Sequence, residues 1–191
     1  MKRAVILHSY GQTSEGHWYP WLKRKLQNRG YHVWSPNMPT PDKPNARAVT
    51  DFLLANKDWD FNDNVIIGHS WGAVQILHLL QNLPADMRVR AAVPVSVYSQ
   101  VLAEEPDWEQ LKGLFEEPFE FAKIKAAAHK FLFVHGDDDP WCDPKQAEYL
   151  AGQVRGELVF IKGGQHFSTS LDPAYTRFPA LIELLETRGL I

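Results

Sequence analysis

The pentapeptide Gly68-His69-Ser70-Trp71-Gly72 has the G-x-S-x-G pattern, which can present a serine hydroxyl as a nucleophile. The apolar run Val65–Ile67 precedes it and predicts a buried strand, and the apolar stretch Trp71–Leu83 follows it and predicts a buried helix. The glycines allow the tight turn that such a junction needs, because side chains there would collide with neighbouring structure. The turn places the hydroxyl at a helix N-terminus, where the partial positive charge favours a developing anion. The pattern therefore predicts Ser70 as a nucleophile, in preference to a serine that only caps the helix.

A serine hydroxyl is a poor nucleophile at neutral pH and needs a base. In folds with this strand-turn-helix junction, the chain order is serine, then acid, then histidine. Four histidines follow Ser70, and they are His78, His129, His135 and His166. The first lies in a predicted helix, the second leads into a predicted strand and the third precedes the candidate acids. His166 lies in a glycine-containing loop between the last predicted strand and the last predicted helix, so we predict it as the base.

Three carboxylates follow the predicted strand Lys130–His135, and they are Asp137, Asp138 and Asp139. We select Asp139, because it stands just before a proline that stiffens its backbone. Its predicted role is to hold the imidazole of the base in one tautomer and to stabilise the imidazolium without taking the proton. The other two acids are expected to be turn or loop residues.

The anionic intermediate of such a reaction needs two backbone N–H donors, which together form an oxyanion hole. One is expected from Trp71, directly after the nucleophile, and the other from the loop after the first strand. In that loop Tyr10 is the expected donor, with Ser9 as the alternative. Two tryptophans, Trp18 and Trp141, stand near the loops that should surround the site, and we expect them to line a pocket for substrate.

Short apolar runs alternate with longer amphipathic stretches along the whole chain. This alternation predicts one α/β domain over residues 1–191, with a doubly wound, mostly parallel sheet. Ligands bind such sheets outside the carboxyl ends of the strands, where the candidate residues lie. The predicted strands are Ala4–Leu7, Tyr31–Trp34, Val65–Ile67, Val89–Val97, Lys130–His135 and Glu157–Ile161. The predicted helices are Trp18–Gly30, Ala46–Ala55, Trp71–Leu83, Ala122–Ala128, Pro144–Val154 and Asp172–Arg188, with an interruption near Pro179 and an irregular or partly helical acidic stretch over Glu104–Glu120.

The composition of the 191 residues narrows the function classes. The net charge of −3 provides no basic excess for nucleic acid or for an anionic membrane surface. A single cysteine excludes an internal disulfide and a cysteine-based zinc site. The apolar run at the N-terminus is too short for an export signal, and no stretch is long enough for a membrane span, so a cytoplasmic location is expected. No glycine-rich nucleotide fingerprint follows a predicted strand, and we expect neither a cofactor nor a metal.

Several segments beyond the pentapeptide carry a resemblance to a known family over nearly the whole chain, and they are His17–Trp21, Phe115–Phe119, Lys123–Lys125, Asp138–Trp141 and Gly164–Phe167. The chain resembles the small serine hydrolases of the α/β-hydrolase fold that are related to retinoblastoma-binding protein 9 and the YdeN-like bacterial proteins. The resemblance implies a minimal α/β-hydrolase fold without a cap domain, a triad of Ser70, Asp139 and His166, and hydrolysis of esters or amides without a metal.

The function that these observations favour is hydrolysis of small carboxylic esters, or of small amides, through an acyl-enzyme on Ser70. Two alternatives remain open at this point. One is a protein-interaction module on a hydrolase fold with little activity, and the other is an acyltransferase that uses the same triad. The segment Ser96–Ala122 is the one long insertion, and we expect it to edge the pocket without forming a cap domain. Composition and motifs leave the natural substrate and the oligomeric state open.

Overall fold

Six strands form the centre of the computed structural model, which describes residues 1–101 and 106–191. Their order in the sheet is β2-β1-β3-β4-β5-β6, and every neighbouring pair is parallel. The predicted doubly wound α/β fold is therefore confirmed. Because the chain moves from β1 to β2 on one side and to β3 on the other, the topological switch point lies between β1 and β3. The strands are β1 (Arg3–Leu7), β2 (His32–Trp34), β3 (Val65–His69), β4 (Val89–Val95), β5 (Ala128–Gly136) and β6 (Glu157–Ile161).

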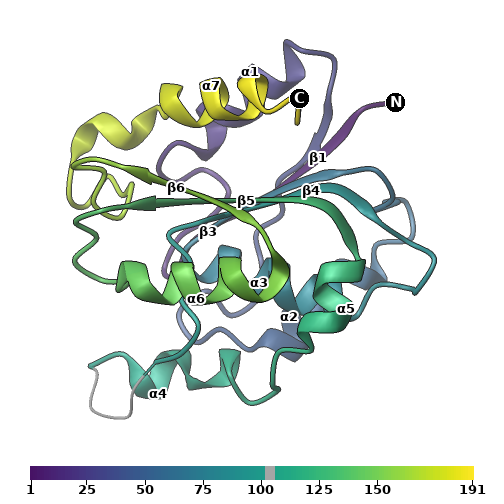
Figure 1. The fold of residues 1–191 in the computed structure, drawn as a ribbon, viewed down its shortest axis with the longest axis horizontal. Helices are drawn as coiled ribbons and strands as arrows, with labels where there is room; N and C mark the ends of the chain where they lie inside the picture. The colour runs from purple at the N-terminus through teal and green to yellow at the C-terminus, as the bar shows by residue number, and fades with distance from the viewer. Residues whose placement is uncertain (102–105) are drawn as a thin grey trace.

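Helices cover both faces of the sheet (Figure 1). One face carries α1 (Tyr19–Gln27) and α7 (Pro179–Thr187). The other face carries α2 (Ala46–Ala55), α3 (Trp71–Gln81), α5 (Phe121–Ala126) and α6 (Pro144–Val154). The short helix α4 (Trp108–Leu111) lies beyond α6, away from the sheet (Figure 1). Two 3-10 helices complete the described elements, η1 (Lys112–Leu114) and η2 (Pro173–Thr176).

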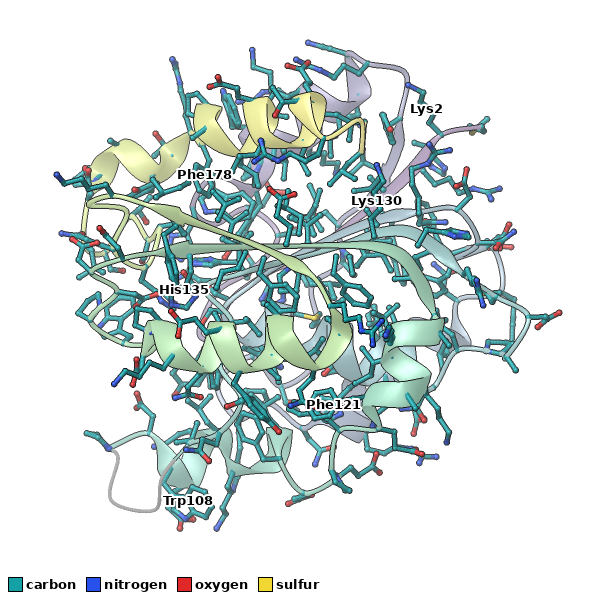
Figure 2. All side chains as sticks on the ribbon, viewed as in Figure 1. Lys2, Trp108, Phe121, Lys130, His135 and Phe178 are labelled. Atoms are coloured by element: carbon teal, nitrogen blue, oxygen red, sulfur yellow. The ribbon has the colours of Figure 1, made fainter. Side chains whose placement is uncertain are left out.

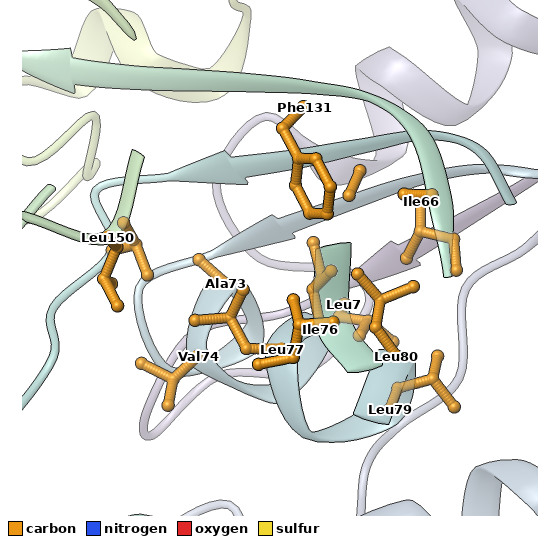
Figure 3. Packing of buried hydrophobic residues seen from close by; sticks show 14 of the residues in the cluster. Leu7, Ile66, Ala73, Val74, Ile76, Leu77, Leu79, Leu80, Phe131 and Leu150 are labelled. Atoms are coloured by element: carbon orange, nitrogen blue, oxygen red, sulfur yellow. The ribbon is translucent and has the colours of Figure 1, made fainter. Parts of the chain in front are cut away.

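The sheet separates two apolar clusters, because successive side chains of a strand point to opposite faces. In β1, Ala4 and Ile6 belong to the cluster under α1 and α7, whereas Val5 and Leu7 belong to the cluster around α3. Figure 3 shows the second cluster, with residues of α3 packed beneath the strands. Figure 2 shows Phe178 on one side of the sheet and Phe121 on the other. Burial on both faces explains why the strands are almost continuously apolar in sequence.

Several element boundaries differ from the prediction for local reasons. The predicted strand Val89–Val97 ends at Val95, because the next residue, Ser96, has a φ of 49° and turns the chain away from the extended conformation. The predicted interruption of the helix Asp172–Arg188 near Pro179 is confirmed, since this proline provides no backbone N–H and begins a separate helix, α7. The acidic stretch Glu104–Glu120 contains α4 and η1, while its residues 104 and 105 lie outside the described residues. None of the helices in the described part of the chain combines the length and the apolar character that crossing a bilayer requires.

The buried His78 of α3 gives the fold a pH-dependent stability. Its Nε2–H donates to the Leu114 carbonyl at 2.7 Å, and burial lowers its pKa to about 4. In the unfolded chain a histidine takes up its proton near pH 6.5. The unfolded state therefore binds more protons between these values, so the stability is complete above pH 6.5 and declines as the pH falls towards 4.

We predict that His78→Gln reduces this pH dependence, because an amide N–H can still reach Leu114 but does not titrate. Wild-type protein should lose about 1.4 kcal/mol of unfolding free energy per pH unit from this group, and the variant should not. Urea unfolding at pH 7 and pH 5 measures the difference. The exposed His129→Gln serves as the control and should keep the wild-type slope. Equal slopes in all three proteins would contradict the prediction.

Candidate active site

Ser70 occupies a strained turn between β3 and α3. Its φ of 56° lies in the left-handed region, which a non-glycine residue adopts at a cost. Its N–H donates to the Val95 carbonyl at 2.8 Å, which extends the β3–β4 pairing into the turn. A Cβ on Gly68 would overlap the Gly72 carbonyl, and one on Gly72 would overlap the carbonyl of Leu7 in β1. Both glycines of the pentapeptide are therefore required by close backbone approach.

Asp139 and His166 are joined by a buried hydrogen bond, as the sequence predicts. Nδ1 of His166 lies 2.8 and 3.0 Å from the two carboxylate oxygens, and the N–H groups of Trp141 and Cys142 donate to Oδ1 at 3.0 Å. Burial acts to raise the pKa of Asp139, but the hydrogen bond from His166 and the two backbone N–H groups outweigh it, so this pKa is lowered. Because an ionised carboxylate only accepts, Nδ1 carries a proton, and Nε2 is the ring nitrogen that remains for proton exchange with a substrate or a nucleophile.

The two preceding aspartates also hold the histidine loop, which the sequence analysis did not foresee. Asp137 Oδ1 accepts from the N–H of Gly163, and Asp138 Oδ1 accepts from the N–H of Gln165, each at 2.8 Å. Three successive carboxylates after β5 thus bind three points of the loop after β6. The pairing of β5 with β6 brings these loops together. In the sequence, the run of three acids was the feature that could have indicated this anchoring.

A cavity of about 670 Å³ brings the candidate residues together at the carboxyl ends of the strands. Ser70, His166 and Tyr10 line it, and it therefore lies at the switch point between β1 and β3. Its volume falls within the usual range for small-molecule sites. Tyr98, Val101 and Leu111 line it from the inserted segment, which confirms that this segment edges the pocket. The described part of the insertion holds only short helices, α4, η1 and α5, so no cap domain is present there.

A second cavity, of about 450 Å³, lies at the other end of β5 and has a different character. Its basic lining residues include Lys125, Arg155 and Arg188. These residues stand in the last turn of α5 and at the C-caps of α6 and α7. Positive charge at these places compensates the partial negative charge of the helix ends. The candidate nucleophile and base are absent from its lining, so the first cavity is the candidate active site.

The three tryptophans of the prediction lie in different environments. Trp141 is 54% exposed, lines the cavity and stands edge-on to the His166 ring at 4.8 Å. The side chain of Trp71 is buried in the core, so only its backbone faces the turn. The expectation that Trp18 lines the pocket is wrong. Its indole is fully buried in the cluster under α1 and α7, and its Nε1–H donates to the Phe167 carbonyl at 3.1 Å.

Backbone hydrogen bonds distinguish the two candidate donors of the first loop. The N–H of Ser9 is already engaged, since it donates to Tyr19 Oη at 3.0 Å. The N–H groups of Tyr10 and Trp71 have no acceptor among the residues that the structure describes. Tyr10 lines the cavity from the loop after β1, and Trp71 begins α3 directly after Ser70, which also lines the cavity. This pair of free donors is the one that could hold a negative oxygen.

His8 fixes the direction of the Tyr10 N–H. The N–H of Met38 donates to His8 Nε2 at 2.8 Å, so Nδ1 carries the proton and donates to the Ser9 carbonyl at 3.0 Å. Burial lowers the pKa of His8, which favours this neutral form. Because the peptide group is planar and trans, a fixed Ser9 carbonyl points the N–H of Tyr10 in the opposite direction.

Comparison with known proteins decides the family. A family model described as "Serine hydrolase" matches residues 4–187. The chain belongs to the serine hydrolase family. This serine hydrolase is 28% identical to YdeN of Bacillus subtilis (strain 168) over 187 residues, which are 96% of this chain and 94% of YdeN. It is 26% identical to the serine hydrolase RBBP9 of Rattus norvegicus over 188 residues, which are 97% of this chain and 94% of RBBP9.

Solved structures agree with the fold of this serine hydrolase. The crystal structure of the B. subtilis ydeN gene product matches with a TM-score of 0.88 and 26% identity, and covers 100% of both chains. Est1E from Butyrivibrio proteoclasticus matches with a TM-score of 0.72 and 20% identity, over 99% of this chain and 87% of Est1E. The first likeness, together with the family match, makes the protein an enzyme with hydrolase activity, and the second supports the α/β fold alone.

We predict that Asp138→Ala lowers kcat for p-nitrophenyl acetate about fivefold, because the loop of His166 loses one hydrogen-bonded anchor worth about 1 kcal/mol. Asp138→Asn should stay closer to the wild type, since its amide oxygen can still accept from Gln165. Steady-state kinetics with both variants measure the effect. Equal activity of Asp138→Ala and the wild type would show that this anchor does not position the loop.

Proposed function

We propose that this serine hydrolase cleaves small carboxylic esters, or small amides, through an acyl-enzyme on Ser70. The observation that carries the proposal is the buried Asp139–His166 hydrogen bond at the cavity that Ser70 also lines. The Nδ1 contact leaves Nε2 as the nitrogen that can act as the base, and His166 lines the same cavity as the serine of the G-x-S-x-G turn. Small molecules that fit a cavity of about 670 Å³ are the proposed partners.

The reaction has two balanced halves. In the first, Ser70 Oγ attacks the substrate carbonyl while His166 Nε2 takes the hydroxyl proton, and the tetrahedral intermediate collapses with return of that proton to the leaving alcohol or amine. In the second, water attacks the acyl-enzyme, His166 takes a proton from the water, and the acid is released as Ser70 regains its proton. Asp139 stabilises the imidazolium in both halves.

The N–H groups of Trp71 and Tyr10 are the proposed oxyanion hole. Tyr10 is preferred to Ser9, because the Ser9 N–H already donates to Tyr19. His8 acts here as a positioning residue through the Ser9 carbonyl. Donors that are fixed before the reaction cost no reorganisation when charge develops, which is the main advantage of such a site.

The pocket wall favours short or aromatic acyl groups. The lining combines Tyr98, Val101 and Leu111 with the half-exposed Trp141 at the mouth. Est1E has been solved with ferulic acid bound, which supports including aromatic acids among the esters to be tested. Each methylene that the pocket buries contributes about 0.8 kcal/mol, and methylenes beyond the pocket contribute nothing.

The nucleophile is tested by labelling with a fluorophosphonate probe. We predict that wild-type protein is labelled and that Ser70→Ala is not, with a fall in kcat of about 10⁴-fold or more. Ser168→Ala is the matched control, because Ser168 lines the same cavity and should leave labelling intact. Labelling that persists in Ser70→Ala would place the nucleophile elsewhere.

The acyl preference is tested with p-nitrophenyl esters of increasing chain length. We predict that kcat/KM rises from acetate and levels off by about hexanoate, because further methylenes extend into solvent. Activity should not jump when the ester forms an emulsion, since the described part of the insertion lines one wall of the pocket and forms no cap domain. A clear preference for long-chain esters would contradict this account of the pocket.

A further inference from the structure

A network of buried hydrogen bonds links Ser9, Tyr19, His69 and His166 beside the cavity. The proposed mechanism assigns no role to Tyr19 or His69. Tyr19 Oη is 3.0 Å from the Ser9 nitrogen and 2.9 Å from Ser9 Oγ. It is also 2.7 Å from His69 Nδ1, and His69 Nε2 is 2.7 Å from the His166 carbonyl oxygen. Tyr19 and His69 are fully buried, and the other two residues are nearly so.

The direction of every hydrogen bond in this network follows from the His166 carbonyl oxygen. A carbonyl oxygen only accepts, so His69 Nε2 carries a proton. Burial lowers the pKa of His69 well below its ordinary value, and the nearby His166 and His17 lower it further, so the imidazole is neutral and Nδ1 must accept. The single proton of the Tyr19 hydroxyl therefore points to His69 Nδ1.

The remaining valences of Tyr19 Oη are then filled by Ser9. The Ser9 N–H donates to one lone pair of Oη, and the Ser9 hydroxyl donates to the other. Each donor and acceptor of Tyr19 and His69 has one partner, which is the condition under which a buried polar network is rigid. Removal of any member would leave a buried polar atom unpaired, at a cost larger than the bond itself contributes.

The hydrogen-bond network connects the three segments whose relative positions the proposed mechanism depends on. Ser9 belongs to the loop after β1 and precedes the oxyanion donor Tyr10. His69 ends β3 and precedes the nucleophile Ser70, while His166 belongs to the loop after β6 and is the base. Tyr19 and His69 therefore bind the backbone or side chain of residues that are catalytic groups or their direct neighbours.

We propose that Tyr19 and His69 form a positioning relay that sets the oxyanion donor, the nucleophile and the base relative to one another. The proposal rests on the proposed function of Ser70 and His166 and assigns new roles to two residues that do not touch the substrate. A relay of this kind acts on the transition state more than on substrate binding, so its loss appears in kcat rather than in KM.

The first test is Tyr19→Phe, which removes the hydroxyl and keeps the ring. With p-nitrophenyl acetate, we expect kcat to fall about 10- to 100-fold, the size of effect that small misplacement of reacting groups produces. KM should stay within about threefold, and fluorophosphonate labelling should slow in proportion to kcat. The matched control is Tyr31→Phe, a buried tyrosine of the same apolar cluster that directly precedes β2 and so lies at the amino ends of the strands, away from the site. It should keep kcat within about twofold of the wild type.

A second pair of variants keeps the test valid if Tyr19→Phe does not fold. His69→Gln retains a side-chain N–H that can reach the His166 carbonyl, whereas His69→Leu retains only apolar volume. We expect kcat to follow the order wild type, His69→Gln, His69→Leu, with KM nearly constant. Equal kcat values for the two variants would overturn the relay.

The outcomes separate the relay from the proposed function. A folded Tyr19→Phe with wild-type kcat, together with loss of labelling in Ser70→Ala, would overturn the relay and leave the nucleophile in place. A kcat loss in Tyr31→Phe equal to that in Tyr19→Phe would also overturn the relay, because it would reflect core stability. Labelling that persists in Ser70→Ala would overturn the proposed function and the relay with it.

Discussion

The close approach of backbone at the carboxyl ends of the strands is the constraint on which the site depends. A Cβ on Gly72 would overlap the Leu7 carbonyl, so the start of α3 can lie directly against the end of β1. A Cβ on Gly136 would overlap the backbone of Gln165, so the loop after β5 can lie directly against the loop after β6. These contacts bring Ser70 and the two loops within reach of one cavity. They also explain why glycine is required at two positions far apart in the sequence.

In the proposed mechanism, His166 carries the positive charge, because its neighbours His17 and His69 stay neutral. Burial, together with the neighbouring His166, lowers the pKa of His17 to about 4 and that of His69 well below its ordinary value. His17 Nδ1 accepts from the N–H of Thr169, and His69 Nδ1 accepts from Tyr19, so each is held in one neutral tautomer. His166 alone of this cluster faces the Asp139 carboxylate, and the imidazolium is stabilised there.

The sequence predicted the sheet and brought forward Ser70, Asp139 and His166, because motif spacing and strand order constrain which loops meet. It was wrong about Trp18, since proximity along the chain to a site loop does not say whether a side chain points to the cavity or to the core. It also missed the anchoring by Asp138 and the contacts of His69. Those bonds depend on the direction of individual backbone N–H and carbonyl groups across the sheet, which periodicity and composition do not determine.

Direct detection of the covalent intermediate is the sharpest test of the account. Protein mixed with p-nitrophenyl acetate and quenched in acid during the first turnover should gain the mass of one acetyl group, and peptide mapping should place it on Ser70. Asp139→Asn should accumulate this species much more slowly, because its amide cannot fix the required imidazole tautomer. An acetyl group on a different residue, or turnover without any covalent adduct under these conditions, would contradict the account.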